Sequence, residues 1–225
     1  MANPDWLRQR ICDIGRRMYD HRYVVATSGN ISARCGDDLF LTTPSGVCKG
    51  EMSPEQIVLV DGAGKLVRQD CLYRQSSEFR LHLAAYTVRP DVAAVVHAHP
   101  PFCTAFATAR IPLDRAVLPE SVLTVGAVPL ASYATLSTWE VPESVAPFLA
   151  DANAVLLANH GVVTFGGDLE EAYHRLEEVE HLAETVYRAR RLGGEVALTA
   201  EELADLDNVR LRMGLPGGAP CRPVE

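Results

Sequence analysis

The spacing of apolar residues predicts a chain in which helices alternate with short strands. An amphipathic helix is expected over about residues 5–19, because Leu7, Ile11, Ile14 and Met18 recur at helical spacing. Further helices are predicted at about 79–89, 101–107, 138–149, 168–192 and 201–213. Runs rich in β-branched residues predict strands at 31–34, 39–42, 57–60, 65–67, 92–99, 122–128, 155–158 and 162–165. This mixture favours a single α/β domain over residues 1–215, followed by a loosely held tail at 216–225 that is rich in Gly and Pro.

Three histidines stand at the ends of predicted strands. His97 and His99 end the run 92–100, and alternate side chains of a strand share a face. Two such imidazoles can reach one metal ion, at about 2.1 Å each if the ion is zinc. His160 follows a second apolar run, at 155–158. A core or surface role is the more common one for any single histidine, but three at strand ends can hold a cation and leave coordination positions open.

One carboxylate and three turns complete the candidate chemistry. Glu78 begins a predicted helix, where it is either a capping carboxylate or a general acid/base and fourth metal ligand. The turns are rich in hydroxyl groups and glycine, and ordinary turn chemistry accounts for each one singly. Together they can line a phosphate pocket made of neutral donors. They are Ser28-Gly29-Asn30, Ser45-Gly46 and Ser76-Ser77.

Composition narrows the class of protein. The 225 residues carry a formal charge of −8 and no basic run, which argues against binding to nucleic acid or to an anionic membrane surface. No apolar run approaches the roughly 18 residues of a membrane span. The first five residues lack the order of a signal peptide, and the six cysteines include no CxxC pair. We therefore expect reduced thiols in a cytoplasmic protein.

The motifs, taken together and in order, resemble the class II aldolase/adducin family. The resemblance extends over about residues 5–205 and is specific as a combination. It is carried by Ser-Gly-Asn-Ile-Ser (28–32), Thr-Pro-Ser-Gly (43–46), Ser-Ser-Glu (76–78), Val-Val-His-Ala-His-Pro (95–100), Tyr-Ala-Thr (133–135) and Leu-Ala-Asn-His-Gly (157–161).

This resemblance implies a fold and a site. The fold is a three-layer α/β/α sandwich with a central mixed, largely antiparallel sheet, assembled as a homotetramer with active sites at subunit contacts. The metal is usually zinc, with Mn²⁺ and Co²⁺ as alternatives, held by His97, His99 and His160. Glu78 is the proton shuttle and alternate metal ligand. The substrate phosphate is cradled by Gly29, Asn30, Ser45, Gly46, Ser76 and Ser77.

The implied reaction is aldol cleavage of a ketose 1-phosphate, either L-fuculose 1-phosphate or a related short-chain sugar phosphate, to dihydroxyacetone phosphate and an aldehyde. Such cleavage needs an electron sink, which is a lysine Schiff base or a metal Lewis acid. The chain has only two lysines, Lys49 and Lys65, both near turns, so the metal route suits it better.

Departures from the family pattern keep other reactions open. The Ser-Ser-Glu motif favours aldolases over epimerases, but the tyrosines that fuculose aldolases use beyond the second histidine and near the C-terminus are absent. Glu120 can take an acid/base role at the aldehyde end, and it can equally be a surface residue before a strand. The alternatives are a sugar-phosphate 4-epimerase, a methylthioribulose-phosphate dehydratase and a non-catalytic adducin-like scaffold.

Overall fold

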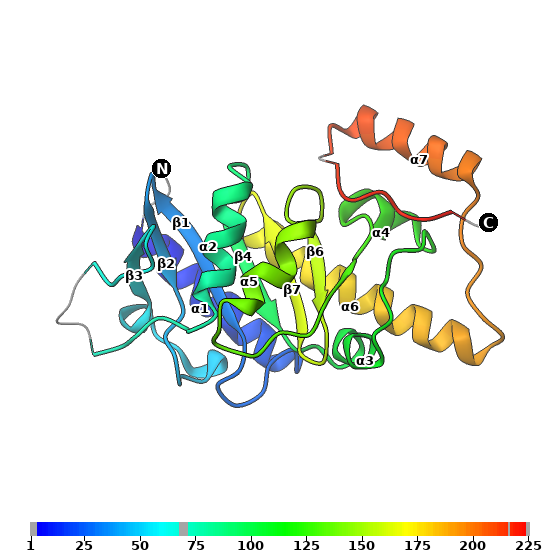
Figure 1. The fold of residues 1–225 in the computed structure, drawn as a ribbon. Helices are drawn as coiled ribbons and strands as arrows, with labels where there is room; N and C mark the ends of the chain where they lie inside the picture. The colour runs from blue at the N-terminus through cyan, green and yellow to red at the C-terminus, as the bar shows by residue number, and fades with distance from the viewer. Residues whose placement is uncertain (1–3, 68–71, 216, 224–225) are drawn as a thin grey trace.

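One seven-stranded sheet organises the molecule (Figure 1). The computed structural model describes residues 4–67, 72–215 and 217–223. The strand order is β3-β2-β1-β4-β7-β6-β5, and every neighbouring pair is antiparallel except β5 and β6. The strands are β1 (Asn30–Gly36), β2 (Leu39–Thr42), β3 (Val58–Asp61), β4 (Ala94–Ala98), β5 (Leu130–Ala131), β6 (Ala154–Leu157) and β7 (Gly161–Gly166).

Helices cover both faces of this sheet. One apolar cluster joins Val96 and Val162 to helices α1, α3 and α6, while a second joins Val95 and Val163 to α2 and α5. Alternate residues of β4 and β7 therefore enter opposite layers, as the period of a strand requires. The helices are α1 (Pro4–Asp20), α2 (Phe79–Val88), α3 (Pro101–Ala109), α4 (Pro119–Thr124), α5 (Glu140–Val145), α6 (Leu169–Arg191) and α7 (Ala200–Met213), with 3-10 turns η1 (Lys49–Glu51), η2 (Pro54–Gln56) and η3 (Ala146–Phe148).

This arrangement confirms the three-layer α/β/α sandwich with a mixed, largely antiparallel sheet. The long helix predicted at 168–192 is α6, and Asp168 caps it by accepting a hydrogen bond from Glu171 N at 2.8 Å. Of the two strands predicted at 57–60 and 65–67, the first is β3 and the second is reduced to an isolated bridge between Val60 and Leu66.

The strand predicted at 122–128 is wrong. Residues 119–124 form α4, and only Val128 makes a strand-like bridge, to Leu113. Pro119 stands in the first turn, where its fixed φ and missing N–H suit a helix start. The helix packs against α6 and α7, so tertiary contacts override the β propensity of Val122 and Val125.

Segment 217–223, for which we expected a loose tail, makes several contacts with the domain. Ala219 O accepts from Ala127 N at 2.9 Å, and Arg222 N donates to Asp114 O at 2.7 Å. Residues 216 and 224–225 of that tail, residues 1–3 of the N-terminal pentapeptide and Cys71 lie outside the described residues. The other five cysteines are free thiols.

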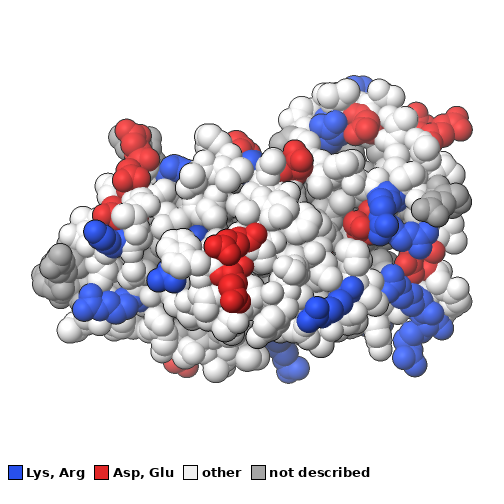
Figure 2. Space-filling view, viewed as in Figure 1, with Lys and Arg blue, Asp and Glu red and all other residues white. Residues whose placement is uncertain are grey.

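Charged side chains of both signs are visible on the face shown in Figure 2. Basic side chains gather toward the right-hand end in that view, with acidic side chains among them, and an acidic group lies near the centre. Within the described part of the chain, no helix is long and apolar enough to cross a bilayer.

Candidate active site

His97 is fixed by the centre of the sheet. It lies in β4 between β1 and β7, opposite Asn30 on one side and Val163 on the other. Its side chain is 1% exposed, and its Nδ1–H donates to the carbonyl oxygen of Val162 at 3.0 Å. Since a carbonyl only accepts, this bond leaves the lone pair on Nε2, which is the nitrogen that faces the other histidines.

His160 is carried by the tight hairpin between β6 and β7. Asn159 adopts a left-handed conformation (φ 59°), and His160 N donates to Leu157 O at 2.9 Å. Gly161 follows at a point of very close approach, because a Cβ there would lie 2.3 Å from Ala98 O and 2.7 Å from the His99 ring. The missing side chain of Gly161 therefore lets the hairpin pack against the end of β4.

The three imidazoles converge. Their ring centroids are 4.6–4.8 Å apart, and their coordinating nitrogens all lie within 4.8 Å of one another. Burial lowers the pKa of His97, His99 and His160, although Glu78 opposes the effect at His160. Neutral imidazoles offer lone pairs rather than protons, which is the state that binds a metal. The cluster thus fits a divalent ion.

Glu78 faces this cluster instead of capping its helix. It occupies the N-cap of α2, but its side chain makes no capping hydrogen bond. Oε2 lies 3.6 Å from His97 Nε2 and accepts from Asn30 Nδ2 at 2.8 Å, while Oε1 lies 3.4 Å from His160 Nε2. Oε1 is buried without a hydrogen-bond partner among the described atoms. This oxygen is consequently available to a metal, to water or to a substrate proton.

Two of the three polar turns meet beside β1. The turn that precedes this strand lies against His97, since a Cβ on Gly29 (φ 73°) would approach His97 O to 2.9 Å. The second turn follows β2, where Thr43 N donates to Ile31 O at 3.0 Å and Thr43 Oγ1 accepts from Ile31 N at 3.1 Å. Gly46 (φ 74°) has open space around it.

The third turn, Ser76-Ser77, is linked to the second turn through the residues that precede it. Ser45 N donates to Arg74 O at 2.8 Å, and Pro44 forms an isolated bridge with Gln75. Ser76 and Ser77 come next, with Ser76 Oγ accepting from Glu78 N at 3.2 Å. Backbone contacts thus bring together the turns of Gly29 and Asn30, of Ser45 and Gly46, and of Ser76 and Ser77.

Glu120 is not joined to the histidine cluster by any described contact. It lies on the exposed side of α4, where its carbonyl accepts from Thr124 Oγ1 at 2.9 Å. Among the described contacts, no ion pair or hydrogen bond joins its carboxylate to the histidine cluster.

Sequence reasoning missed two contributors to the site region. The Val162 carbonyl orients His97, and no side-chain motif signals a backbone acceptor. Lys49 is fully buried behind the polar turns, donating to Thr27 O and Val47 O. Its sequence signal is the scarcity of lysine in the chain, which we used only to argue against a Schiff base.

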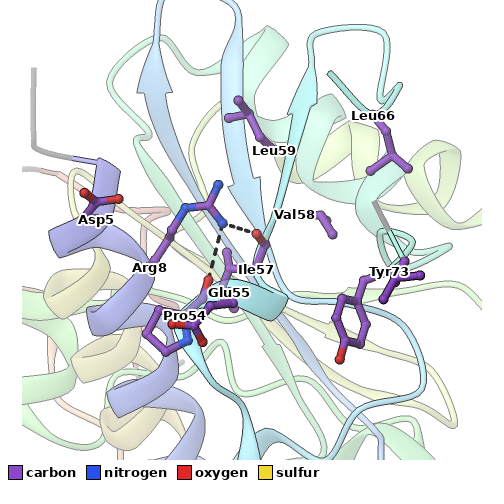
Figure 3. Close-up of a pocket in the computed structure, with 10 residues that line it drawn as sticks. Asp5, Arg8, Pro54, Glu55, Ile57, Val58, Leu59, Leu66 and Tyr73 are labelled. Atoms are coloured by element: carbon purple, nitrogen blue, oxygen red, sulfur yellow. Dashed lines mark hydrogen bonds between the residues drawn. The ribbon is translucent and has the colours of Figure 1, made fainter. Parts of the chain in front are cut away.

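A separate cavity of about 800 Å³ lies beside α1 and β3 (Figure 3). Apolar side chains such as Leu59 and Leu66 line it, and Arg8 reaches across one side to donate to the carbonyls of Pro54 and Ile57. None of the predicted site residues lines this cavity.

A largely antiparallel sheet that gathers three histidines and a carboxylate in one cluster defines an α/β protein with a candidate metal site. The family model for the class II aldolase and adducin N-terminal domain matches residues 9–187. The chain therefore belongs to the class II aldolase/adducin family, as its motifs predicted.

Its relatives act on different phosphorylated substrates. It is 34% identical over 178 residues to an L-fuculose phosphate aldolase of Methanococcus maripaludis, covering 79% of this chain and 93% of that one. It is 33% identical to a 5-methylthioribulose-1-phosphate/5-deoxyribulose-1-phosphate aldolase of Rhodospirillum rubrum, covering 88% and 87% of the two chains. A 3-oxo-tetronate 4-phosphate decarboxylase of Escherichia coli is also 33% identical, with coverage of 89% and 94%.

The fold comparison agrees with the family assignment. A solved L-fuculose 1-phosphate aldolase superimposes with a TM-score of 0.84 at 32% identity, covering 93% of this chain and 97% of the other. The named relatives are lyases, namely aldolases and a decarboxylase.

Proposed function

We propose that the protein is a metal-dependent aldolase that cleaves a ketose 1-phosphate between C3 and C4 to dihydroxyacetone phosphate and an aldehyde. The observation that carries this proposal is the convergence of His97, His99 and His160 with the unpartnered Oε1 of Glu78. The turn of Gly29, which packs against the same strand end, and the two turns linked to it support a phosphate site beside the cluster.

His97, His99 and His160 would hold the metal, which we propose to be zinc, with Mn²⁺ or Co²⁺ as alternatives. When bound, such an ion supplies a Lewis acid that polarises the substrate carbonyl. The imidazoles are oriented for this by packing and by the Val162 carbonyl.

Glu78 would move the proton. In the cleavage direction its carboxyl group delivers a proton to C3, the carbon from which C4 departs. In the synthetic direction its carboxylate removes that proton. Asn30 Nδ2 holds Oε2 near His97, and Oε1 lies toward His160.

The phosphate is proposed to bind Gly29, Asn30, Ser45, Gly46, Ser76 and Ser77. Backbone N–H groups and hydroxyls of such turns bind anions without a formal charge in contact. At the opposite end of the substrate, Glu120 is proposed to act on the aldehyde oxygen. Because Glu120 is exposed, this role requires the site to extend to the surface of α4.

The test is a cleavage assay of the zinc-loaded protein with L-fuculose 1-phosphate, ribulose 1-phosphate and 5-deoxyribulose 1-phosphate. We expect dihydroxyacetone phosphate from at least one of them, detected by its enzymatic reduction. Product masses distinguish cleavage from epimerisation or dehydration. Failure of all three substrates to yield two fragments would contradict the proposed reaction.

Decarboxylation is a second candidate, favoured by the 33% identity to the 3-oxo-tetronate 4-phosphate decarboxylase. The same metal site would serve it, since both reactions leave electrons on a carbon next to a carbonyl. Release of CO₂ from a 3-oxo acid phosphate, without cleavage of the three ketoses, would select this function.

We further propose a cytoplasmic homotetramer with active sites at subunit contacts, as the family resemblance implies. Light scattering coupled to size exclusion would measure about four times the 24.5 kDa chain mass. A purified protein that neither contains nor takes up a divalent ion would favour the adducin-like scaffold instead.

A further inference from the structure

Lys49 is a buried ammonium group that joins two of the polar turns. It lies in η1 with 1% of its surface exposed. Its Nζ donates to Thr27 O at 2.9 Å and to Val47 O at 2.7 Å. Thr27 directly precedes the turn of Gly29 and Asn30, and Val47 directly follows Gly46.

No carboxylate balances this charge. Although Asp and Glu number 29, none of those described forms an ion pair with Lys49 Nζ. Among the described residues, the neighbouring Cys48 is the group that interacts electrostatically with it, and α1, which packs on η1, contributes the ring of Tyr19 against Gly50. A buried cation without a counter-ion is costly, so its retention calls for a physical reason.

We propose that the phosphate of the substrate is the counter-ion of Lys49. In this role Lys49 is a positioning residue: its two hydrogen bonds hold the turns of Gly29 and Gly46 at a fixed separation, and its charge attracts the dianion that they enclose. This inference rests on the phosphate assignment made under the proposed function, and adds to it a positively charged group next to the pocket.

The proposal has a reciprocal consequence for protonation. Burial lowers the pKa of Lys49 to about 8, so its charge is lost as the pH rises through that value in the free protein. An anion favours the charged form, and binding must therefore raise the pKa of Lys49. By linkage, affinity for a phosphate dianion is highest below pH 8 and falls above it.

The direct test is a lysine-selective NMR titration of the metal-loaded protein. With only two lysines, Lys49 and Lys65, the labelled protein gives two Nζ signals. Methyl phosphate is the probe, since phosphate monoesters have a second pKa of about 6 and stay dianionic across the titration. We expect its addition to raise the pKa of Lys49 by about one unit, corresponding to a tenfold gain in affinity. An unchanged Lys49 titration at saturating methyl phosphate would overturn the proposal.

Variants supply a second measurement. Lys49→Met should weaken the binding of methyl phosphate about tenfold, which is the scale of one charge-assisted interaction. The zinc content should stay unchanged. Lys65→Met, at the exposed lysine, is the matched control and should bind as the parent protein does. Lys49→Arg should keep binding but lose its decline above pH 8, because guanidinium does not titrate there. Cys48→Ala should retain that decline, which assigns it to Lys49 and not to the thiol.

These outcomes separate the inference from the proposed reaction. Binding of methyl phosphate requires no bond cleavage, so a protein that binds it through Lys49 but cleaves no ketose loses only the aldolase assignment. A parent protein that does not bind methyl phosphate, or a folded Lys49→Met variant that binds it with unchanged affinity, overturns the role of Lys49. If Lys49→Met fails to fold, the titration of the parent protein decides.

Discussion

At the scale of single residues, His97 is the most firmly fixed of the three clustered histidines. It is the most buried of the three histidines and the one whose tautomer a backbone carbonyl fixes. His99 and His160 stand nearer to the surface, with ring centroids 4.8 and 4.6 Å from that of His97, and His99 Nε2 lies 3.0 Å from His97 Nε2. Because β4 lies in the middle of the sheet, between β1 and β7, the position of His97 is set by strand pairing on both sides.

We expect His97→Ala to lose tight metal binding and nearly all activity, because two imidazoles remain and the metal loses its best-oriented ligand. Elemental analysis after dialysis measures the metal, and circular dichroism checks the fold. His174→Ala is the control, since His174 is exposed on α6 and should keep the metal. Full metal occupancy in folded His97→Ala would contradict the assigned site.

Glu78→Gln should keep the metal but slow proton transfer by about 10²–10⁴-fold, the usual contribution of a positioned acid/base. The amide retains the shape of the side chain and its contact with Asn30, but it cannot carry the proton. Exchange of solvent deuterium into dihydroxyacetone phosphate measures this step. An exchange rate equal to that of the parent protein would remove Glu78 from the proposed role.

At the scale of elements, the sequence predicted those whose pattern is local. Helix α6 could be predicted from the 3.6-residue spacing of its apolar side chains and from its N-cap residue, Asp168. Strands β1 and β2 could be predicted from two apolar runs that flank a turn. Helix α4 could not be predicted, since its β-branched residues favour a strand and its packing partners, α6 and α7, lie far along the chain. The clustered histidines could be predicted because each follows an apolar run in the sequence. The contact of His97 with the Val162 carbonyl and the burial of Lys49 could not, because they form only when distant segments pack together.

The β6–β7 hairpin gives a test at this scale. Gly161→Ala would place a methyl group 2.3 Å from Ala98 O, so the hairpin must shift away from β4 and carry His160 with it. We expect weaker metal binding and a loss of about 1–3 kcal/mol of stability, typical of overpacking. Metal titration and denaturant unfolding measure the two effects. Gly36→Ala is the control, since its nearest new contact is the Leu39 side chain at 3.4 Å, and equal metal affinity in the two variants would refute the packing argument.

At the scale of the whole molecule, the sheet assembles a site from segments that are distant along the chain. Glu78 comes from the start of α2, His97 from β4 and His160 from the β6–β7 hairpin. The pairing of β4 with β7 brings His97 beside that hairpin, and Asn30 of β1, which lies opposite His97, holds Glu78 beside them. The unfolded chain holds none of these groups in place. A metal that binds the assembled site must therefore stabilise the entire fold.

Removal of the metal should accordingly lower the thermal midpoint. A ligand present at about 100 times its Kd stabilises the folded state by about 2.7 kcal/mol. For a chain of this size each kcal/mol corresponds to roughly 2–4 °C, so a chelator should lower Tm by about 5–10 °C. Differential scanning calorimetry with and without chelator measures the shift, and restoring zinc should reverse it. The same treatment should leave the Tm of His97→Ala unchanged, because that variant has no metal to lose; a shift of equal size in both proteins would place the stabilising ion somewhere other than the histidine cluster.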